Sequence, residues 1–159
     1  MHFIFDLDHT VIDSSHRQIT RADGSLDLAA WIQNNTRANI MGDSLLPLAA
    51  QWRRADKKGA TIVICTARVM GAHDYDFLAE NGLRWDACLS RPAGNTLPDA
   101  ELKEALLRRY AQTRPMTWPR FCASSVFFDD NKNVLGMLDR IGIRAYNSIS
   151  LNETLRRTA

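Results

Sequence analysis

The sequence predicts an α/β fold of three layers, in which helices cover both faces of a doubly wound parallel sheet. Short apolar runs alternate along the chain with amphipathic segments of helical period. This alternation is typical of strand–helix–strand units, whose right-handed crossovers bring the carboxyl ends of the strands to one edge of the sheet. The length of 159 residues fits one domain with a sizeable core, so we expect a single domain over 1–159.

Strands and helices are expected in alternating order. The strands are the apolar runs 2–6, 61–65, 85–89, 124–128 and 143–146. The first main helix takes Asp43 or Ser44 as its N-cap, tolerates Pro47 in its first turn and ends at Gly59. The other helices span about 73–81, 99–111 and 132–141, and the last of them stops at Gly142.

The segment of about 14–42 has a different character, because it is polar and carries only a short apolar group around Trp31. With roughly 30 residues it is too small to form an independent domain, so we expect a small helical lid, or an extended loop, that acts as a minimal cap. Trp31 is expected to pack beneath this lid, and stacking on a nucleobase is the alternative. Pro115 and Pro119 are expected to bound a loop.

Two carboxylates follow the first predicted strand. Asp6 and Asp8 lie two residues apart, so an extended chain places both on the same side. Like charges this close need compensation, and Mg²⁺ prefers the hard oxygen ligands that carboxylates offer. The pair therefore indicates a metal site that includes a nucleophilic or acid/base carboxylate. Turn or helix-cap chemistry is the alternative explanation.

Polar residues also end two more of the predicted strands. Thr66 and Arg68 follow the second strand, and Asp129 and Asp130 follow the fourth. Ligands bind at this edge of open parallel sheets. Lys103 lies early in a helix, where the helix dipole disfavours a cation, and this indicates a partner for the ammonium group. A strand end, a helix cap and a solvated lysine are the structural alternatives.

The chain resembles the haloacid dehalogenase superfamily of phosphohydrolases over nearly its whole length. Four motifs carry the resemblance in order: Asp6-Leu7-Asp8-His9-Thr10, Thr66, Lys103 and Asp129-Asp130. The segments 66–68 and 91–103 also resemble the 3′-phosphatase half of phage polynucleotide kinases. Three positions depart from these patterns, since His9 replaces the usual Gly, Asn95 replaces an acid and Asn131 replaces an Arg.

The superfamily resemblance implies a phosphatase that forms an aspartyl-phosphate intermediate. It makes Asp6 the nucleophile and Asp8 the general acid/base. One Mg²⁺ ion would be held by Asp6, the backbone carbonyl of Asp8, and Asp129. Asp130 would support the metal or Lys103, and Thr10 would brace the loop after Asp8.

The same resemblance implies that cationic and hydroxyl side chains hold the substrate's phosphate. Thr66 and Lys103 would bind the phosphoryl oxygens. Arg68 and Arg91 would grip the reacting phosphate or a neighbouring one, because a guanidinium group binds phosphate through two N–H groups. A surface salt bridge is the alternative for each arginine.

Composition bounds the location and the partners. The net charge of +2 permits a nucleic-acid partner without arguing for one. No apolar stretch approaches the roughly 18 residues that a membrane span needs, so no membrane partner is expected. Asp6 and Asp8 interrupt any signal-peptide core. The three cysteines, Cys65, Cys88 and Cys122, are expected to be reduced thiols. A cytoplasmic location is therefore expected, in the host cell if the protein is phage-encoded.

The expected function is a Mg²⁺-dependent phosphomonoesterase that removes the 3′-phosphate from nucleic-acid ends, because a small lid leaves the site open to a polymer. A deoxynucleotidase acting on free mononucleotides is the enzymatic alternative. A non-catalytic phosphate-binding or phosphoacceptor regulator is the alternative from another class. The chain contains no Gly-x-x-x-x-Gly-Lys-Ser/Thr motif, so a kinase half is not expected.

Overall fold

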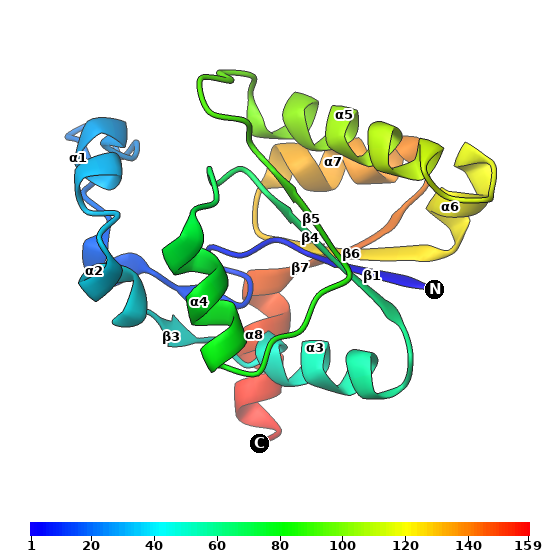
Figure 1. Ribbon diagram of the computed structural model, residues 1–159, viewed down its shortest axis with the longest axis horizontal. Coiled ribbons are helices and arrows are strands. Elements are labelled where there is room, and N and C mark those ends of the chain that lie inside the picture. The colour runs from blue at the N-terminus through cyan, green and yellow to red at the C-terminus, as the bar shows by residue number, and fades with distance from the viewer.

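A five-stranded parallel sheet forms the centre of the computed structural model, which describes all 159 residues (Figure 1). The strands stand in the order β5-β4-β1-β6-β7, and each neighbouring pair is parallel. Their bounds are β1 His2–Phe5, β4 Thr61–Thr66, β5 Ala87–Ser90, β6 Ser125–Asp129 and β7 Arg144–Asn147. The predicted fold class is confirmed, and all five predicted strands are present.

Helices cover both faces of the sheet, as Figure 1 shows. One face carries α3 (Leu48–Lys57), α4 (Ala72–Glu80) and α8 (Ser148–Arg157), and the other carries α5 (Asp99–Gln112), α6 (Trp118–Ala123) and α7 (Lys132–Ile141). Successive strand residues point to opposite faces, so each face has its own apolar core. Phe5 and Ile64 belong to the first core, whereas Ile4 and Val63 belong to the second.

The register of the central strands aligns the ends that carry the polar motifs. Within β1, Phe5 pairs with Ile64 of β4 on one side and with Phe128 of β6 on the other. The backbone N–H of Asp6 then donates to the carbonyl oxygen of Phe128 at 3.0 Å. Asp6 therefore leaves the sheet beside the residue that follows Phe128, which is Asp129.

The start of the first main helix was predicted wrongly. The helix α3 begins at Leu48 with Pro47 in the N-cap position, and Asp43 does not cap it. Ser44 instead lies in a short strand, β3 (Ser44–Leu45), which pairs antiparallel with β2 (Ile12–Asp13). The Asp43 carboxylate accepts hydrogen bonds from a buried arginine, Arg17. The charged hydrogen bonds to Arg17 are stronger than a bond to a backbone N–H, so the Asp43 side chain pairs with Arg17 and does not cap the helix.

Two helices occur where none was expected. The helix α6 forms across Pro119, because Thr117 caps it by accepting a hydrogen bond from the Arg120 N–H and the proline sits in the first turn. The helix α8 is mostly polar, but Leu151 and Leu155 are four residues apart and both pack against the first core. Tertiary packing therefore stabilises a helix that the sequence marks only weakly.

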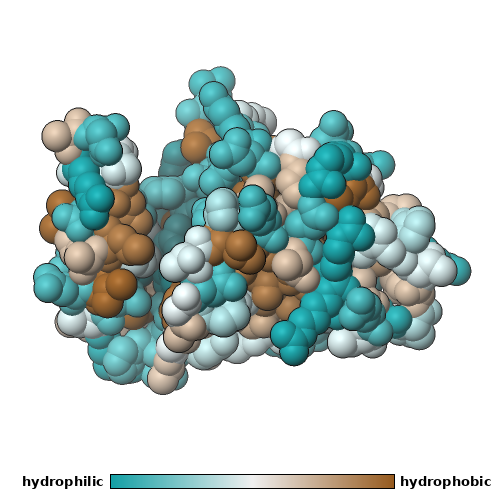
Figure 2. Space-filling view, turned by 90° about the horizontal axis from the view of Figure 1, so that it is seen from above, coloured by the Kyte–Doolittle hydropathy of each residue, from teal (hydrophilic) through white to brown (hydrophobic).

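The segment between β1 and α3 is partly helical, and we call it the lid after its predicted role of covering the site, which stays a prediction. It contains a 3₁₀ helix, η1 (Ser15–Arg17), and two short helices, α1 (Leu28–Gln33) and α2 (Arg37–Met41). In the space-filling view this lobe stands apart at the left, beside a hydrophilic furrow (Figure 2). A hydrophobic stretch long enough to cross a membrane is absent from every helix of the protein.

Candidate active site

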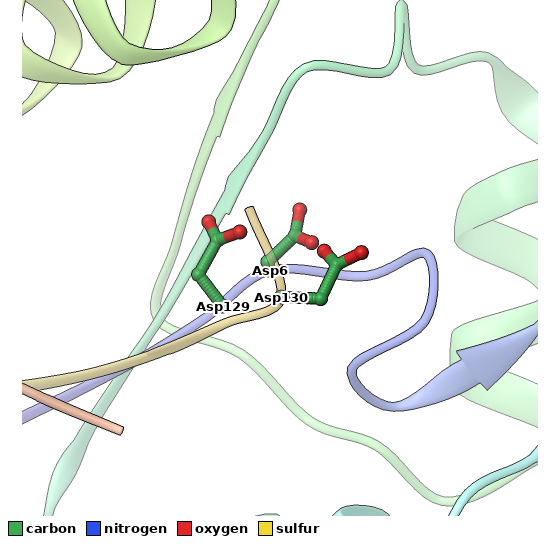
Figure 3. A group of neighbouring side chains, drawn as sticks. All are labelled: Asp6, Asp129 and Asp130. Carbon is green, nitrogen blue, oxygen red and sulfur yellow. The ribbon is translucent and has the colours of Figure 1, made fainter. Parts of the chain in front are cut away.

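The carboxyl edge of the sheet gathers three acidic side chains. Asp6 follows β1, whereas Asp129 ends β6 and Asp130 comes next in the chain. Ligand oxygens from the three carboxylates all lie within 4.8 Å of one another. Figure 3 shows these side chains converging from two neighbouring strand ends. Asp129 is fully buried and Asp6 is buried, so their charges have little access to water.

Lys103 of α5 reaches this acidic cluster and pairs with two of its members. Its Nζ atom lies 3.0 Å from Asp6 Oδ1 and 2.7 Å from Asp129 Oδ2. The lysine side chain is buried, which is rare for an ammonium group unless it is paired. The prediction that Lys103 has a partner is confirmed, and the solvated alternative is wrong. One ammonium group nevertheless faces three carboxylates, so the cluster keeps an excess of negative charge.

This excess is visible in the proton affinities of the acids. Burial raises the pKa of Asp6 to about 7, and the charges of Asp129 and Asp8 add to the effect although Lys103 opposes it. Burial, together with the charge of Asp6, raises the pKa of Asp130 to about 6. Burial also raises the pKa of Asp129 despite the ammonium group of Lys103. A cation bound among these carboxylates would relieve the repulsion.

The donor set fits Mg²⁺. Three carboxylates offer hard oxygen atoms, and the cluster lacks the nitrogen and sulfur ligands that transition metals favour. The members are Asp6, Asp129 and Asp130, so Asp130 joins the predicted pair. The carboxylate of Asp8 is not a member.

The Asp8 carboxylate lies between Ser14 and Arg68. The Ser14 hydroxyl donates to Asp8 Oδ1 at 2.6 Å. Arg68 donates from Nη2 to the same oxygen at 2.5 Å and from Nε to Asp8 Oδ2 at 3.2 Å. Burial raises the pKa of Asp8, but the Arg68 guanidinium and Ser14 outweigh it and hold that pKa below its ordinary value. This second acid is therefore ionised while no substrate competes for Arg68.

A second acid fixes the other end of the Arg68 side chain. Arg68 Nη1 donates to Asp74 Oδ1 at 2.6 Å, and the other Asp74 oxygen accepts the Gly71 N–H at 2.8 Å. The backbone N–H of Arg68 donates to Thr66 Oγ1 at 3.0 Å. Thr66 and Arg68 are both buried at the end of β4, where the motif predicted them. The guanidinium is thus held at the site by two carboxylates.

Arg91 does not join this group, because its guanidinium braces the loop before α5. Nε donates to the Ala67 carbonyl at 2.9 Å, and Nη1 donates to the Leu97 carbonyl at 2.8 Å. Nη2 donates to Asp99 Oδ1 at 2.9 Å. Asn95, which replaces the acid of the kinase-linked phosphatases, accepts a further bond from Arg91 through its backbone oxygen. The structure therefore ties the loop 91–99 to the segment that carries Thr66.

Comparison with known proteins identifies the family of this chain. The model of the bacteriophage T5 5′-deoxynucleotidase family matches residues 1–158. The 5′-deoxynucleotidase of Escherichia phage T5 is 30% identical over 173 residues, which cover 96% of this chain and 68% of that protein. The chain belongs to the phage T5 5′-deoxynucleotidase family. It is accordingly a hydrolase of the phosphatase type.

Solved structures place this deoxynucleotidase-family chain in the haloacid dehalogenase-like fold. A haloacid dehalogenase-like hydrolase from Streptococcus pneumoniae has a TM-score of 0.62 and 12% identity, with 99% of this chain and 98% of that chain covered. A chain of the Pnkp1/Rnl/Hen1 RNA repair complex has a TM-score of 0.61 and 18% identity. That match covers 91% of this chain but only 41% of the other, so this chain spans less than half of the longer protein.

The loop that follows Asp6 in this family member is braced by α8, which sequence reasoning missed. Thr10 Oγ1 donates to Ser148 Oγ at 3.0 Å and lies 3.3 Å from Asp6 Oδ2. The amide of Asn152 donates to the Thr10 carbonyl at 3.0 Å and accepts the Leu48 N–H at 2.9 Å. Thr10 therefore has the predicted bracing position. No local pattern marks Ser148 or Asn152, since their partners are more than 100 residues away.

The lid is anchored by a buried ion pair that also escaped sequence reasoning. Arg17 Nε and Nη2 each donate to an Asp43 oxygen at 2.9 Å, and both side chains are buried. The Arg17 guanidinium lies 4.3 Å from the ring centroid of Trp31, and that of Arg68 lies 5.7 Å away. Trp31 is only 9% exposed. Trp31 is thus buried against two guanidinium groups and belongs to neither apolar core, and stacking on a nucleobase stays a prediction.

Proposed function

We propose that this chain is a Mg²⁺-dependent 5′-deoxynucleotidase, which hydrolyses the phosphate monoester of free deoxynucleoside monophosphates. The family match over residues 1–158 carries the proposal. The carboxyl edge of the sheet supplies the groups that this chemistry needs, namely a buried carboxylate, a second carboxylate two residues later and a buried ammonium group. Of the two substrates that the sequence suggested, the mononucleotide therefore comes first and the polymer end second.

Asp6 is the proposed nucleophile. One of its carboxylate oxygens forms a bond to phosphorus as the bond from phosphorus to the O5′ atom breaks. Asp8, which takes up a proton from solvent once the substrate phosphate has drawn Arg68 away, gives that proton to the leaving oxygen. In the second step Asp8 takes a proton from water, whose oxygen attacks phosphorus and restores the Asp6 carboxylate. The products are a nucleoside and inorganic phosphate.

The remaining groups bind the phosphate. Lys103 and the Thr66 hydroxyl would hold phosphoryl oxygens, which carry charge in the transition state. Arg68 would also bind them, because a phosphate dianion competes with the Asp8 carboxylate for the guanidinium. Substrate binding would thus weaken the Arg68–Asp8 ion pair and leave Asp8 free to carry the proton of the first step. Asp74 would keep Arg68 at the site during this exchange.

Mg²⁺ would be held by Asp6, Asp129 and Asp130, and the backbone carbonyl of Asp8 stays a predicted ligand. When bound, the ion would neutralise negative charge on the phosphoryl group. Without it, the approach of a phosphate dianion to three carboxylates and one ammonium group is electrostatically unfavourable. The lid of residues 14–42 would serve as the cap over this centre.

The second candidate is removal of a 3′-phosphate from a nucleic-acid end. The resemblance of segment 91–103 to kinase-linked 3′-phosphatases favours it. The structure offers less support than the sequence did, because Arg91 already donates to Ala67, Leu97 and Asp99. Arg91 would act on a polymer substrate only by shaping the loop, unless it left these partners.

Phosphate release from three substrates tests the proposal. We expect the wild type to hydrolyse deoxynucleoside 5′-monophosphates only when Mg²⁺ is present. We expect it to leave a 3′-phosphorylated oligodeoxynucleotide nearly untouched. Asp6→Asn is the inactive control for contaminating phosphatases. Preferential hydrolysis of the oligonucleotide would replace the proposal with the second candidate. No release from either substrate or from p-nitrophenyl phosphate would favour a phosphate-binding or phosphoacceptor regulator.

A further inference from the structure

We infer that Ser14, Gln18 and His9 form a hydrogen-bonded strap that positions the proton-donating carboxyl group of Asp8. The Ser14 hydroxyl donates to Asp8 Oδ1 at 2.6 Å, and Gln18 Nε2 donates to Ser14 Oγ at 3.0 Å. The strap ends at His9, whose Nε2 lies 3.1 Å from Gln18 Oε1. These three are positioning residues that act through Asp8. The inference rests on the proposed function, in which Asp8 protonates the leaving oxygen.

The hydrogen bonds of the strap run in one direction. Because the Gln18 amide nitrogen faces Ser14, its oxygen faces His9 and accepts the Nε2–H of the imidazole. Each group therefore donates toward the next and finally toward the carboxylate of Asp8. Chains of this kind polarise one another, so the last bond, from Ser14, is strengthened. The charge of Asp8 is thereby stabilised by the hydroxyl group of Ser14, which the amide of Gln18 supports.

Ser14 is used for Asp8 rather than for its own helix. It occupies the N-cap position of η1, where a serine side chain ordinarily accepts a backbone N–H, yet it makes no capping hydrogen bond. The side chain is fully buried. Its hydroxyl group donates to Asp8, six residues earlier in the chain, and does not cap η1. This choice links the start of the lid to the active-site loop.

His9 holds a conformation that disfavours a side chain. It is the one non-glycine residue with a positive φ, at 61°. A residue with a Cβ atom is strained there, and glycine is the residue that the superfamily resemblance leads one to expect. The backbone on both sides is fixed, since the His9 N–H donates to Ile12 and the His9 carbonyl accepts from Ser148. The imidazole contact with Gln18 gives a reason for a histidine at this strained position.

The strap also distinguishes the two oxygens of Asp8. Oδ1 accepts from both Ser14 and Arg68, whereas Oδ2 accepts from Arg68 alone. When a substrate phosphate draws Arg68 away, Ser14 still holds Oδ1 and Oδ2 loses its protein donor. Oδ2 is then the oxygen that carries the proton to the leaving group. Without the strap, the Asp8 carboxyl group could rotate freely once the substrate phosphate has drawn Arg68 away.

A positioning role predicts a dependence on the leaving group. A deoxynucleoside leaves as an alkoxide unless it is protonated, whereas p-nitrophenolate is stable enough to leave without a proton. The ratio kcat/KM reports the first phosphoryl transfer, in which Asp8 acts as the acid. Loss of the strap should therefore reduce kcat/KM for a nucleotide much more than for p-nitrophenyl phosphate.

The test uses Ser14→Ala with Ser15→Ala as its matched control. Ser15 is the exposed neighbour and donates only to Asp13. For Ser14→Ala we expect kcat/KM to fall about tenfold on a deoxynucleoside 5′-monophosphate and less than about threefold on p-nitrophenyl phosphate, as for one lost hydrogen bond to a charged group. Ser15→Ala should match the wild type on both. Equal losses on the two substrates, or none, would overturn the inference.

His9→Gly gives an independent reading, because it removes the imidazole and relieves the positive φ at once. We expect its melting temperature to equal or exceed that of the wild type while the nucleotide-selective loss of kcat/KM persists. Wild-type activity in this variant would exclude His9 from the strap. Should the wild type prefer another alkyl phosphate, such as glycerol phosphate, the proposed substrate would be wrong, and the same comparison made with that ester would still decide the role of the strap.

Discussion

Replacing the proposed nucleophile Asp6 with Asn should abolish hydrolysis in Mg²⁺ and should stabilise the metal-free protein. Burial raises the pKa of Asp6 from its ordinary 3.8 to about 7. Folding therefore opposes ionisation of this carboxyl group, and each factor of ten in proton affinity corresponds to about 1.4 kcal/mol. The difference amounts to about 4 kcal/mol of destabilisation above pH 7, as an upper limit. Asp6→Asn removes the charge and keeps the shape.

The sign of the pH dependence follows from the raised pKa. Below pH 3.8 Asp6 is protonated in both the folded and the unfolded states, so it contributes no penalty. Between this value and about 7 the folded state binds more protons than the unfolded state, and stability falls as the pH rises. Asn does not titrate. The stability advantage of Asp6→Asn should therefore be less than half as large at pH 5 as at pH 8.

Thermal melting in EDTA from pH 5 to 8, with phosphate release measured in Mg²⁺, checks this prediction. A gain of about 2 kcal/mol would raise the melting temperature by roughly 4–8 °C in a domain of this size. Asp13→Asn is a suitable control, since Asp13 is paired with Ser15 near the surface. A variant that melts below the wild type at pH 8, or whose advantage does not change with pH, would refute the reasoning.

Three further results are expected. Mg²⁺ should bind more tightly as the pH rises from 5 to 8, because Asp6 and Asp130, with pKa values of about 7 and 6, must lose their protons first; a calorimetric affinity that does not change with pH would contradict this. Arg17→Met should cost about 3 kcal/mol in denaturant unfolding, because it leaves the buried Asp43 carboxylate with the His16 imidazole as its one remaining side-chain partner; a cost below about 1 kcal/mol would show that the lid anchor is dispensable. Lys103→Met should abolish phosphate release at any Mg²⁺ concentration and lower the metal-free melting temperature; substantial activity would exclude this lysine from the site.

The sequence predicted the strands, the sheet edge and the acidic centre well, because each depends on local patterns. Apolar runs such as 61–65 identify buried strands, and parallel topology then brings Asp6, Thr66 and Asp129 to one edge. The partner of Lys103 could be anticipated from an unfavourable place in its helix. These inferences need only the order of elements and the handedness of their connections.

Long-range polar contacts could not be predicted in the same way. The local sequence predicts that Asp43 caps a helix, but its carboxylate accepts a hydrogen bond from the buried Arg17, which lies 26 residues earlier in the chain. Arg91 has the residue type of a phosphate ligand, yet the backbone carbonyl groups of Ala67 and Leu97 accept hydrogen bonds from it. Ser148 contacts Thr10 across 138 residues. Such partners follow from the packed structure and leave no periodic signal.

Identification of a phosphorylated residue during turnover tests the central claim most directly. The enzyme would be quenched in acid while it hydrolyses a deoxynucleoside 5′-monophosphate with Mg²⁺, and the peptide that contains Asp6 and Asp8 would be sequenced by mass spectrometry. We predict one phosphoryl group on Asp6 in the wild type and none in Asp6→Asn. Turnover of the nucleotide with a phosphoryl group on Asp8, or on no carboxylate at all, would contradict the proposed mechanism.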